Sequence, residues 1–136
     1  MKTLVVEDDF TSRLFLQKLL STYGSVHTAV DGQKAVEAVR TAMEINRPYN
    51  LICMDIVMPG MDGQQAIREI RALKDAKSNF TSKGVKIFMA KIIMTTALDG
   101  FQGKINAFSG LCDDYLVKPI DPESLLVVLR DMKLIP

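Results

Sequence analysis

The sequence predicts a doubly wound α/β fold, in which helices cover both faces of one parallel sheet. Short apolar runs alternate with amphipathic stretches five times along the 136 residues. Short apolar runs of this kind are typical of parallel strands that are buried on both faces. Each right-handed crossover then packs a helix against the sheet. The length suits one core, so we expect a single domain over residues 1–136.

The first two strand–helix units have clear boundaries. Residues 4–6 predict a strand, and 10–23 predict a helix because four apolar residues fall at helical spacing before a glycine: Leu14, Phe15, Leu19 and Leu20. Residues 26–30 predict the second strand and Asp31-Gly32 a turn. A helix over 33–46 then has an inward face formed by Ala35, Val36, Val39, Ala42 and Met43.

The third unit leads into a polar stretch without a pattern. Residues 51–55 predict a strand, and a loop containing Pro59, Gly60 and Gly63 follows it. The next helix has an apolar face formed by Ala66, Ile67, Ile70 and Leu73. Residues 74–86 are polar and lack helical periodicity, so we expect an exposed insertion there.

The fourth unit has an ambiguous register. Residues 87–94 predict a strand, but KIFM and KIIM are near duplicates, and either could pair with the neighbouring strand. We favour 92–94, which directly precede Thr95-Thr96. Residues 99–110 predict a weak helix, and we expect it to be mobile because interior glycine destabilises helices; its glycines are Gly100, Gly103 and Gly110.

The fifth unit closes the predicted fold. Residues 115–117 predict a strand and 124–132 a helix. Asp121 can cap this helix, and Pro122 suits its first position.

Composition excludes several classes of function. Seventeen basic and sixteen acidic residues leave a formal charge of +1, which gives no general attraction to nucleic acid or to an anionic membrane. No apolar run is long enough for a signal peptide or a membrane span, so we expect a cytoplasmic protein. Cys53 and Cys112 lack metal-binding or redox spacing and are expected to be reduced packing residues. His27 is expected to be a strand residue without a catalytic task.

Functional side chains follow four of the predicted strands. Ligands of doubly wound sheets bind beyond the carboxyl ends of the strands. Residues far apart in the sequence are therefore expected to converge at one edge of the sheet: Glu7, Asp8, Asp55, Thr95, Thr96 and Lys118.

These residue types suit phosphoryl transfer to a carboxylate. Mg²⁺ prefers oxygen ligands and retains several waters, so two or three acids suffice to hold it. Asp55 is the candidate nucleophile, which would form an acyl phosphate. Lys118 and the cation would neutralise the transferred group, and a threonine hydroxyl could donate a hydrogen bond to it. Acids at strand ends can also be solvated turn residues or caps, and Asp9 could cap the helix that begins near Phe10.

Four motifs resemble, in order, the signature regions of the receiver domain of two-component response regulators, in a stand-alone, chemotaxis-regulator-like form. The motifs are LVVEDD followed by Arg13, DIVMPGMDG around Asp55, TTA at 95–97 and DDYLVKP at 113–119. They cover essentially the whole chain. The resemblance implies a flavodoxin-like fold with five parallel strands in the order 2-1-3-4-5.

The resemblance also implies roles for individual residues. Glu7 and Asp8 correspond to the acidic pair that holds Mg²⁺, with Asp8 as the direct ligand, and Asp9 falls outside the pair. Asp55 corresponds to the phosphoacceptor, and the backbone carbonyl of Val57 to a further metal ligand. Thr96, beside Thr95, corresponds to the hydroxyl that engages the phosphoryl group, and Lys118 corresponds to the lysine that binds it. Pro119 corresponds to a proline whose preceding peptide bond is often cis, and Tyr115 to the aromatic residue that reorients on activation.

The implied function is that of a phosphoacceptor in a histidine–aspartate phosphorelay. A histidine kinase or histidine phosphotransfer protein would be the donor, and docking candidates near the first helix are Thr11, Arg13, Leu14 and Gln17. Phosphorylation would change the face formed by 99–132, which would bind an unknown output protein, because no output domain follows before Pro136. We expect no enzymatic activity beyond self-phosphorylation and slow autodephosphorylation, because Val57 and Leu98 cannot orient a hydrolytic water.

Two alternatives remain open. The chain could be a receiver-like binding scaffold that is not phosphorylated. It could also be a phosphohydrolase of haloacid dehalogenase type, although that class places an Asp-x-Asp nucleophile after the first strand, where residues 7–9 read Glu-Asp-Asp.

The receiver domain family usually has glycine at the position of Leu111, and Gly110 stands one position early, which could shift the end of the preceding helix.

Overall fold

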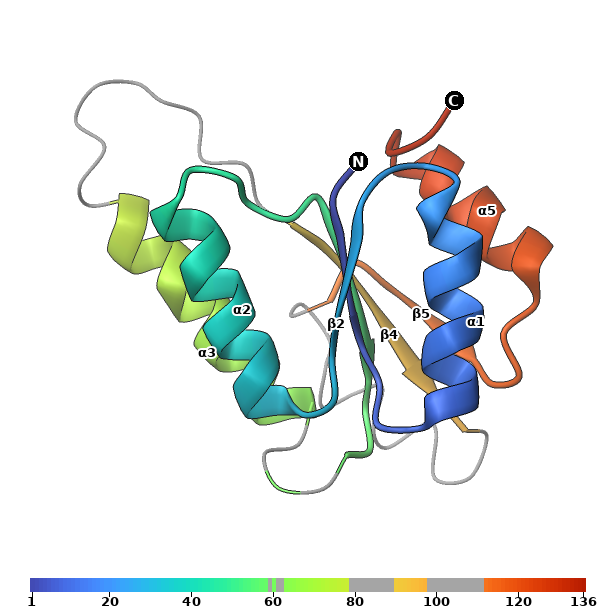
Figure 1. The fold of residues 1–136 in the computed structure, drawn as a ribbon, viewed down its shortest axis with the longest axis horizontal. Helices are drawn as coiled ribbons and strands as arrows, with labels where there is room; N and C mark the ends of the chain where they lie inside the picture. The colour runs from blue at the N-terminus through green and yellow to red at the C-terminus, as the bar shows by residue number, and fades with distance from the viewer. Residues whose placement is uncertain (59, 61–62, 79–89, 98–111) are drawn as a thin grey trace.

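Five parallel strands form one sheet, in the order β2-β1-β3-β4-β5. This is a computed structural model, and it describes residues 1–58, 60, 63–78, 90–97 and 112–136. Figure 1 shows the sheet at the centre of the molecule, and its order confirms the order that the resemblance implied. The strands are β1 (Thr3–Val6), β2 (Val26–Ala29), β3 (Leu51–Asp55), β4 (Lys91–Thr96) and β5 (Asp114–Val117).

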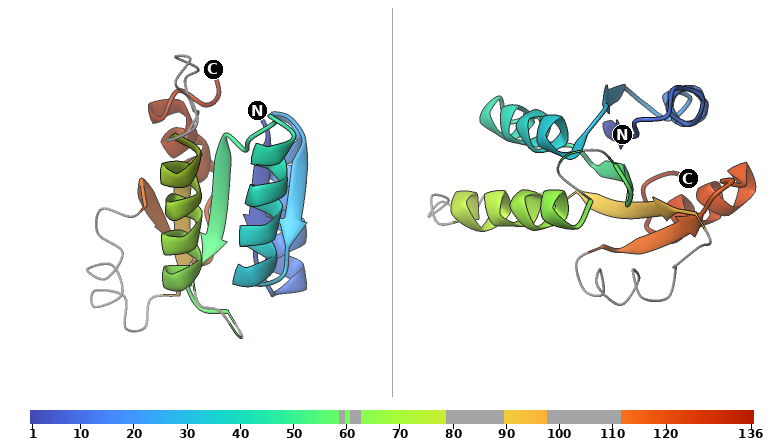
Figure 2. Two further views of the ribbon diagram at one scale, coloured as in Figure 1. Left: turned by 90° about the vertical axis from the view of Figure 1, so that its left-hand side faces the viewer. Right: turned by 90° about the horizontal axis from the view of Figure 1, so that it is seen from below.

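Helices cover both faces of the sheet, as predicted. The described helices are α1 (Phe10–Ser21), α2 (Gly32–Glu44), α3 (Gly63–Ser78) and α5 (Pro122–Asp131). Figures 1 and 2 show α2 and α3 side by side on one face, with α1 and α5 on the other. Within the described ranges, the structure contains no helix that is long and apolar enough to cross a membrane.

Alternation along the strands supplies two cores, one on each face. In β1, Leu4 and Val6 pack toward α2 and α3, while Val5 packs toward α1 and α5. This is the two-residue period of a strand that is buried on both faces. The first core includes Val36, Val39, Ile52, Ile67 and Met94, and the second includes Leu16, Leu20, Ile93, Leu125 and Leu129.

The packing face of α1 differs from the prediction. Leu16 is buried with Leu20, four residues later, whereas Leu14 and Phe15 are 36% and 39% exposed. The segment offers apolar residues at more than one helical phase, so spacing alone could not decide which phase faces the sheet. The exposed pair is thereby left at the surface of α1.

The predicted insertion begins later than expected. Helix α3 continues to Ser78, so residues 74–78 extend the helix where the sequence predicted irregular structure. Helix propensity and contact with the preceding turns carry a helix past the end of its apolar pattern. Residues 79–86 lie outside the described residues.

Strand β4 settles the ambiguous register in favour of 92–94. Ile92, Ile93 and Met94 pair with Ile52, Cys53 and Met54 of β3, respectively. The strand begins at Lys91, and 87–89 lie outside the described residues. The predictions for the glycine-containing helix over 99–110 and for Leu111 also lie outside them.

Aspartates cap three of the helices. Asp9, Asp31 and Asp121 each accept a hydrogen bond from the backbone N–H three residues later. The structure thus confirms Asp9 and Asp121 as caps, with Pro122 at the start of α5. Asp31 was predicted in a turn, but its side chain satisfies an otherwise free N–H at the start of α2.

The remaining packing residues lie where the sequence predicted. Cys53 is buried and Cys112 is partly buried, and burial raises the pKa of the Cys53 thiol to about 12. His27 lies in β2, and its Nδ1 atom is 2.8 Å from the hydroxyl of Tyr49. Burial raises the pKa of Tyr49.

Candidate functional site

The carboxyl edge of the sheet brings the predicted acidic residues together. Glu7 follows β1, and its N–H donates to Ala29 of β2, which continues the ladder by one residue. Asp55 ends β3. One carboxylate oxygen each from Glu7, Asp8 and Asp55 lies within 4.8 Å of the others. Glu7 and Asp55 are buried, whereas Asp8 is exposed.

Lys118 directly follows β5 and reaches this cluster along the same edge of the sheet. Its Nζ atom lies 2.9 Å from Oε2 of Glu7 and 3.3 Å from Oδ2 of Asp55. The hydrogen bonds between β4 and β5 fix the backbone of Lys118, because its N–H donates to the carbonyl of Thr96 at the end of β4. The peptide bond between Lys118 and Pro119 is cis.

The charges of the site shift two pKa values. Burial raises the pKa of Glu7, the charge of Asp55 raises it further, and Lys118 opposes both effects. Burial on its own would lower the pKa of Lys118, but its hydrogen bond to Glu7 and the two carboxylate charges outweigh burial and raise it. Lys118 is therefore held in its charged form.

Two hydrogen bonds and one close contact link Val57 and Gly63 to residues 55–56. Oδ1 of Asp55 accepts a hydrogen bond of 3.2 Å from the N–H of Val57, whose side chain is 58% exposed. The N–H of Gly63 donates to the carbonyl of Ile56. A Cβ on Gly63 would lie only 2.9 Å from the carbonyl oxygen of Asp55, so this close approach requires glycine.

The two predicted switch residues lie close in the fold but differ in exposure. Thr96 ends β4 and is buried, and its hydroxyl donates to the carbonyl of Ala97 at 3.1 Å. Thr95 is also buried and pairs with Asp55 in the sheet. Tyr115 pairs with Met94 across β4 and β5, and its side chain is 40% exposed.

Arg13 contacts the site, although the sequence suggested it only as part of the first family motif and as a docking candidate. Its Nη1 atom donates to the backbone carbonyls of Glu7 and Asp8, at 3.0 and 3.3 Å. Side chains in a helix lean toward its N-terminus, so a long donor in the first turn of α1 can reach the preceding loop. That lean is the sequence signal that could have revealed this contact.

A small cavity lies beside Lys118, between the start of α1 and the segment before α5. Its volume is about 300 Å³, and its lining is largely apolar. The lining residues are Thr11, Ser12, Phe15, Leu16, Lys118, Pro119 and Ile120.

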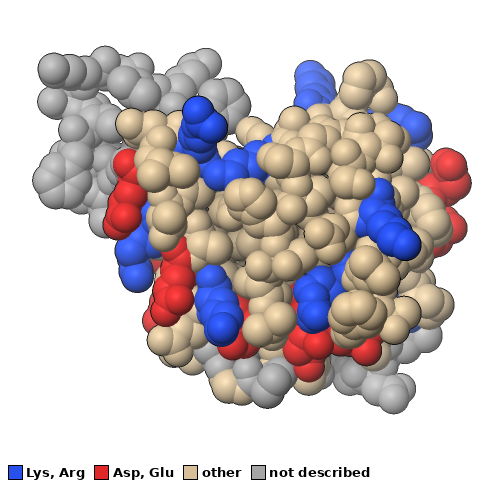
Figure 3. All heavy atoms as spheres, viewed as in Figure 1, with Lys and Arg blue, Asp and Glu red and all other residues tan. Residues whose placement is uncertain are grey.

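The donor set fits a hard divalent cation. Carboxylate oxygens are the ligands that Mg²⁺ prefers, and a site with few protein ligands leaves room for water. Lys118 offsets one of the three carboxylate charges, and a divalent cation would offset the other two. Figure 3 shows acidic side chains gathered at the lower edge of the view, where β1 and β3 end in Figure 1.

The protein is thus a doubly wound α/β domain with an acidic cluster and a lysine at the carboxyl edge of its sheet. The sequence model of the response regulator receiver domain family matches residues 3–130 of the chain. This chain belongs to the response regulator receiver domain family.

Individual relatives agree with this assignment. The chain is 33% identical over 132 residues to "Probable transcriptional regulator ycf27" of Cyanophora paradoxa, covering 96% of this chain but 47% of the relative. It thus spans less than half of that relative's length. It is 33% identical over 138 residues to "Two-component response regulator ORR41" of Oryza sativa subsp. japonica, covering 98% of this chain and 95% of the rice protein.

A solved structure shows the same fold. The receiver domain of the sensor histidine kinase PA1611 from Pseudomonas aeruginosa PAO1 is 27% identical to this chain, with a TM-score of 0.74. The similarity covers 96% of this chain and 94% of that domain. That structure is described with a magnesium ion coordinated in the active site cleft.

Proposed function

We propose that this chain accepts a phosphoryl group on Asp55 from a phosphohistidine of a histidine kinase or a histidine phosphotransfer protein. One observation supports this most: Lys118 Nζ lies 3.3 Å from the Asp55 carboxylate, within a cluster of three acids. The arrangement supplies a nucleophile and a fixed positive charge for the transferred group.

The transfer is a displacement at phosphorus. A carboxylate oxygen of Asp55 forms the new P–O bond while the P–N bond to the donor imidazole breaks. The bonding electrons return to the imidazole nitrogen, which takes up a proton. Lys118 faces Asp55 before transfer and can hold a phosphoryl oxygen afterwards.

The acidic cluster would hold Mg²⁺. Its protein ligands would be the carboxylates of Glu7, Asp8 and Asp55. The family resemblance adds the backbone carbonyl of Val57. When bound, the ion neutralises charge on the transferring group. The magnesium described in the PA1611 receiver domain supports this choice of metal.

Phosphorylation would bias the domain between two states. A phosphoryl group on Asp55 adds strong acceptors beside β4, where Thr96 now donates to its own neighbour's carbonyl. Turning that hydroxyl toward the phosphoryl group would make room for Tyr115, which is now partly exposed. The face over 99–132 would then present a different surface to an output protein.

The donor protein would dock beside the site on α1. Thr11, Leu14 and Gln17 are exposed there, and the apolar cavity lined by Phe15 and Pro119 adjoins them. Arg13 is less available than the sequence suggested, because its guanidinium already donates to two carbonyls.

Autodephosphorylation would be slow. The Val57 side chain beside Asp55 is apolar and cannot orient a hydrolytic water. Loss of the phosphoryl group is expected over minutes or longer, and a half-life of seconds would contradict this.

Intact mass spectrometry tests the proposed function. Wild type and the variants Asp55→Asn and Asp9→Asn are incubated with acetyl phosphate and Mg²⁺. One phosphoryl adduct is expected for wild type and Asp9→Asn, and none for Asp55→Asn. No adduct on wild type would instead indicate a binding scaffold, and continued phosphate release without an adduct would indicate a hydrolase.

A further inference from the structure

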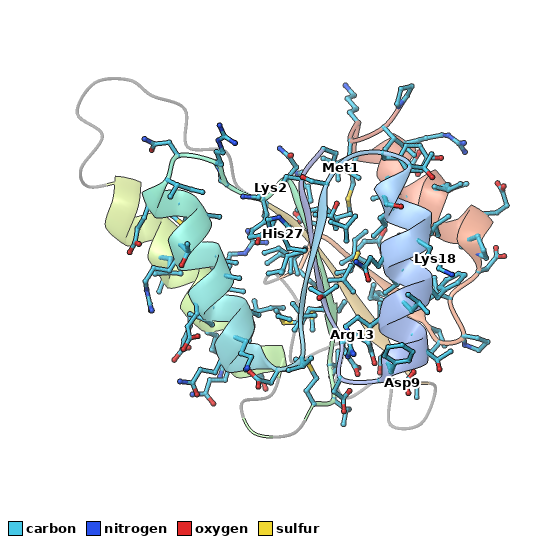
Figure 4. The ribbon with its side chains drawn as sticks, in the orientation of Figure 1. Met1, Lys2, Asp9, Arg13, Lys18 and His27 are labelled. Carbon is cyan, nitrogen blue, oxygen red and sulfur yellow. The ribbon has the colours of Figure 1, made fainter. Side chains whose placement is uncertain are left out.

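We propose that Arg13 is a positioning residue of the acidic site, which it serves by holding the backbone turn that carries Glu7 and Asp8. This inference rests on the proposed Mg²⁺ site and extends it to a residue outside the acidic cluster. Figure 4 shows Arg13 on the sheet side of the first turn of α1, close to Asp9.

The contacts of Arg13 enclose the turn. Nη1 donates to both carbonyls that flank the Asp8 side chain along the backbone, Glu7 O at 3.0 Å and Asp8 O at 3.3 Å. Two carbonyls that approach one point need a donor between them, and a charged donor forms stronger hydrogen bonds than a neutral one. The guanidinium therefore fixes the backbone from which the exposed Asp8 carboxylate projects.

Further contacts hold the two ends of the turn. Oε1 of Glu7 accepts from the N–H of Asp9 at 3.3 Å, and the Asp9 carboxylate accepts from the N–H of Ser12 at 2.8 Å. The Arg13 guanidinium also lies 5.6 Å from the centre of the Phe10 ring, within the range of a cation–π interaction. The Arg13 side chain binds the carbonyls that lie between these contacts.

The choice of acceptors matters for metal binding. Arg13 donates to carbonyls, so it does not engage the carboxylates of Glu7 and Asp8 that belong to the cluster. The positive charge of Arg13 nevertheless lies near the proposed Mg²⁺ site and would repel the ion. Positioning and charge thus act in opposite directions: removal of Arg13 weakens Mg²⁺ binding if positioning dominates, and tightens it if charge dominates.

Calorimetric titration with MgCl₂ decides between these two effects. We compare wild type with Arg13→Gln, which removes the charge and most of the reach. Lys18→Gln is the control, because it removes the same charge from an exposed position of α1. We expect Arg13→Gln to raise the Kd by about tenfold, the low end for partners that orient metal ligands, and Lys18→Gln to leave it nearly unchanged. An unchanged or lower Kd for Arg13→Gln would overturn the proposal.

A second variant and a second measurement keep the test independent of folding. Arg13→Lys retains the charge but not the planar guanidinium fork, so its Kd is expected to lie between those of wild type and Arg13→Gln. If Arg13→Gln does not fold, Arg13→Lys takes its place in the test. Without metal, the amides of Asp8 and Asp9 should exchange faster in Arg13→Gln than in Lys18→Gln. Equal exchange would contradict positioning.

The two proposals fail in distinguishable ways. If wild type binds Mg²⁺ but takes up no phosphoryl group, the proposed function fails and the role of Arg13 stands. If wild type is phosphorylated on Asp55 but Arg13→Gln alters neither Kd nor exchange, the role of Arg13 fails alone.

Discussion

The Nζ atom of Lys118 lies 2.9 Å from Oε2 of Glu7, 111 residues earlier in the chain. The Glu7 side chain is 1% exposed, so Lys118 provides the positive charge that compensates a buried carboxylate. The same ammonium group lies 3.3 Å from Asp55. One lysine thus compensates both the buried carboxylate of Glu7, after the first strand, and the charge of Asp55.

Lys118→Ala is expected to destabilise the fold, and increasingly so as pH rises. A buried carboxylate without its partner costs roughly 1–3 kcal/mol. The folded-state pKa of Glu7 is already raised by burial, and loss of Lys118 raises it further. A raised folded pKa means that the folded state holds the proton more tightly, so stability is retained below the ordinary pKa of glutamate and lost as pH rises through the folded pKa.

Urea denaturation measured between pH 4 and 8 in metal-free buffer checks this expectation. The difference in unfolding free energy between wild type and Lys118→Ala should widen toward pH 8. The double variant Glu7→Gln/Lys118→Ala removes the buried charge and should lose most of this pH dependence. A constant difference across the range would show that Glu7 is not the group responsible.

Gly63→Ala is expected to disturb the site as well as the fold. The new Cβ would lie 2.9 Å from the carbonyl oxygen of Asp55 and 3.1 Å from the Cα of Ile56, and both are backbone atoms. Relief requires the segment after β3 to move, at a cost of about 1–3 kcal/mol. We expect a lower rate of phosphorylation by acetyl phosphate together with a lower Tm.

Gly60→Ala is the matched control for this clash. Gly60 has a φ of +76° and open space around its added Cβ, so alanine there strains the backbone without touching Asp55. The left-handed conformation costs roughly 1–2 kcal/mol. A phosphorylation rate reduced equally by both substitutions would contradict a specific role for the contact at Gly63.

Asp9→Ala and Asp31→Ala should each lower Tm, because each removes the cap of a helix. Asp9 accepts from the N–H of Ser12 and Asp31 from that of Lys34, both at 2.8 Å. The hydrogen bond from Ser12 lowers the pKa of Asp9, so this cap is retained above the ordinary aspartate pKa and lost as pH falls through the folded value. Thermal melts at pH 7 and pH 3 should therefore show a smaller effect of Asp9→Ala at pH 3.

Phosphorylation of these two cap variants should match that of wild type. Asp9 stands next to Asp8 in the sequence, yet its carboxylate caps α1. A phosphorylation defect in Asp9→Ala that is absent in Asp31→Ala would instead place Asp9 in the acidic site.

Tyr49→Phe is expected to destabilise the amino end of the sheet by about 1 kcal/mol. The buried Tyr49 hydroxyl lies 2.8 Å from Nδ1 of His27, and the two rings meet edge to face with centres 5.6 Å apart. A double-mutant cycle with His27→Phe, which keeps a ring in β2, isolates the hydrogen bond. Additive effects in urea denaturation would mean that the bond contributes nothing.

The sequence predicted the sheet and its edge well, for physical reasons. Residues 51–54 form a continuous apolar run that ends at Asp55, and parallel connectivity then places every carboxyl end on one edge. Asp9 and Asp121 were recognised as caps because capping depends on a few neighbouring residues. These features depend on local sequence or on topology alone.

Features that depend on tertiary packing could not be predicted in the same way. The burial of Leu16 and the exposure of Leu14 and Phe15 are set by how α1 lies on the sheet, and several apolar phases were available. No apolar periodicity in 74–78 predicted that α3 would extend through these residues. The lean of a side chain in the first turn of α1 allows Arg13 to reach the preceding loop, but the backbone carbonyls that it binds are not marked by any residue type.

Reductive trapping shows directly whether Asp55 carries the phosphoryl group. Borohydride reduces an acyl phosphate to an alcohol, so a phosphorylated aspartate becomes homoserine, which peptide mass spectrometry can locate. After treatment with acetyl phosphate, Mg²⁺ and then borohydride, we predict homoserine at position 55 and unchanged aspartate at Asp8 and Asp9. Homoserine at either of those two positions, or an intact Asp55 in a protein that carries a phosphoryl group, would contradict the proposed function.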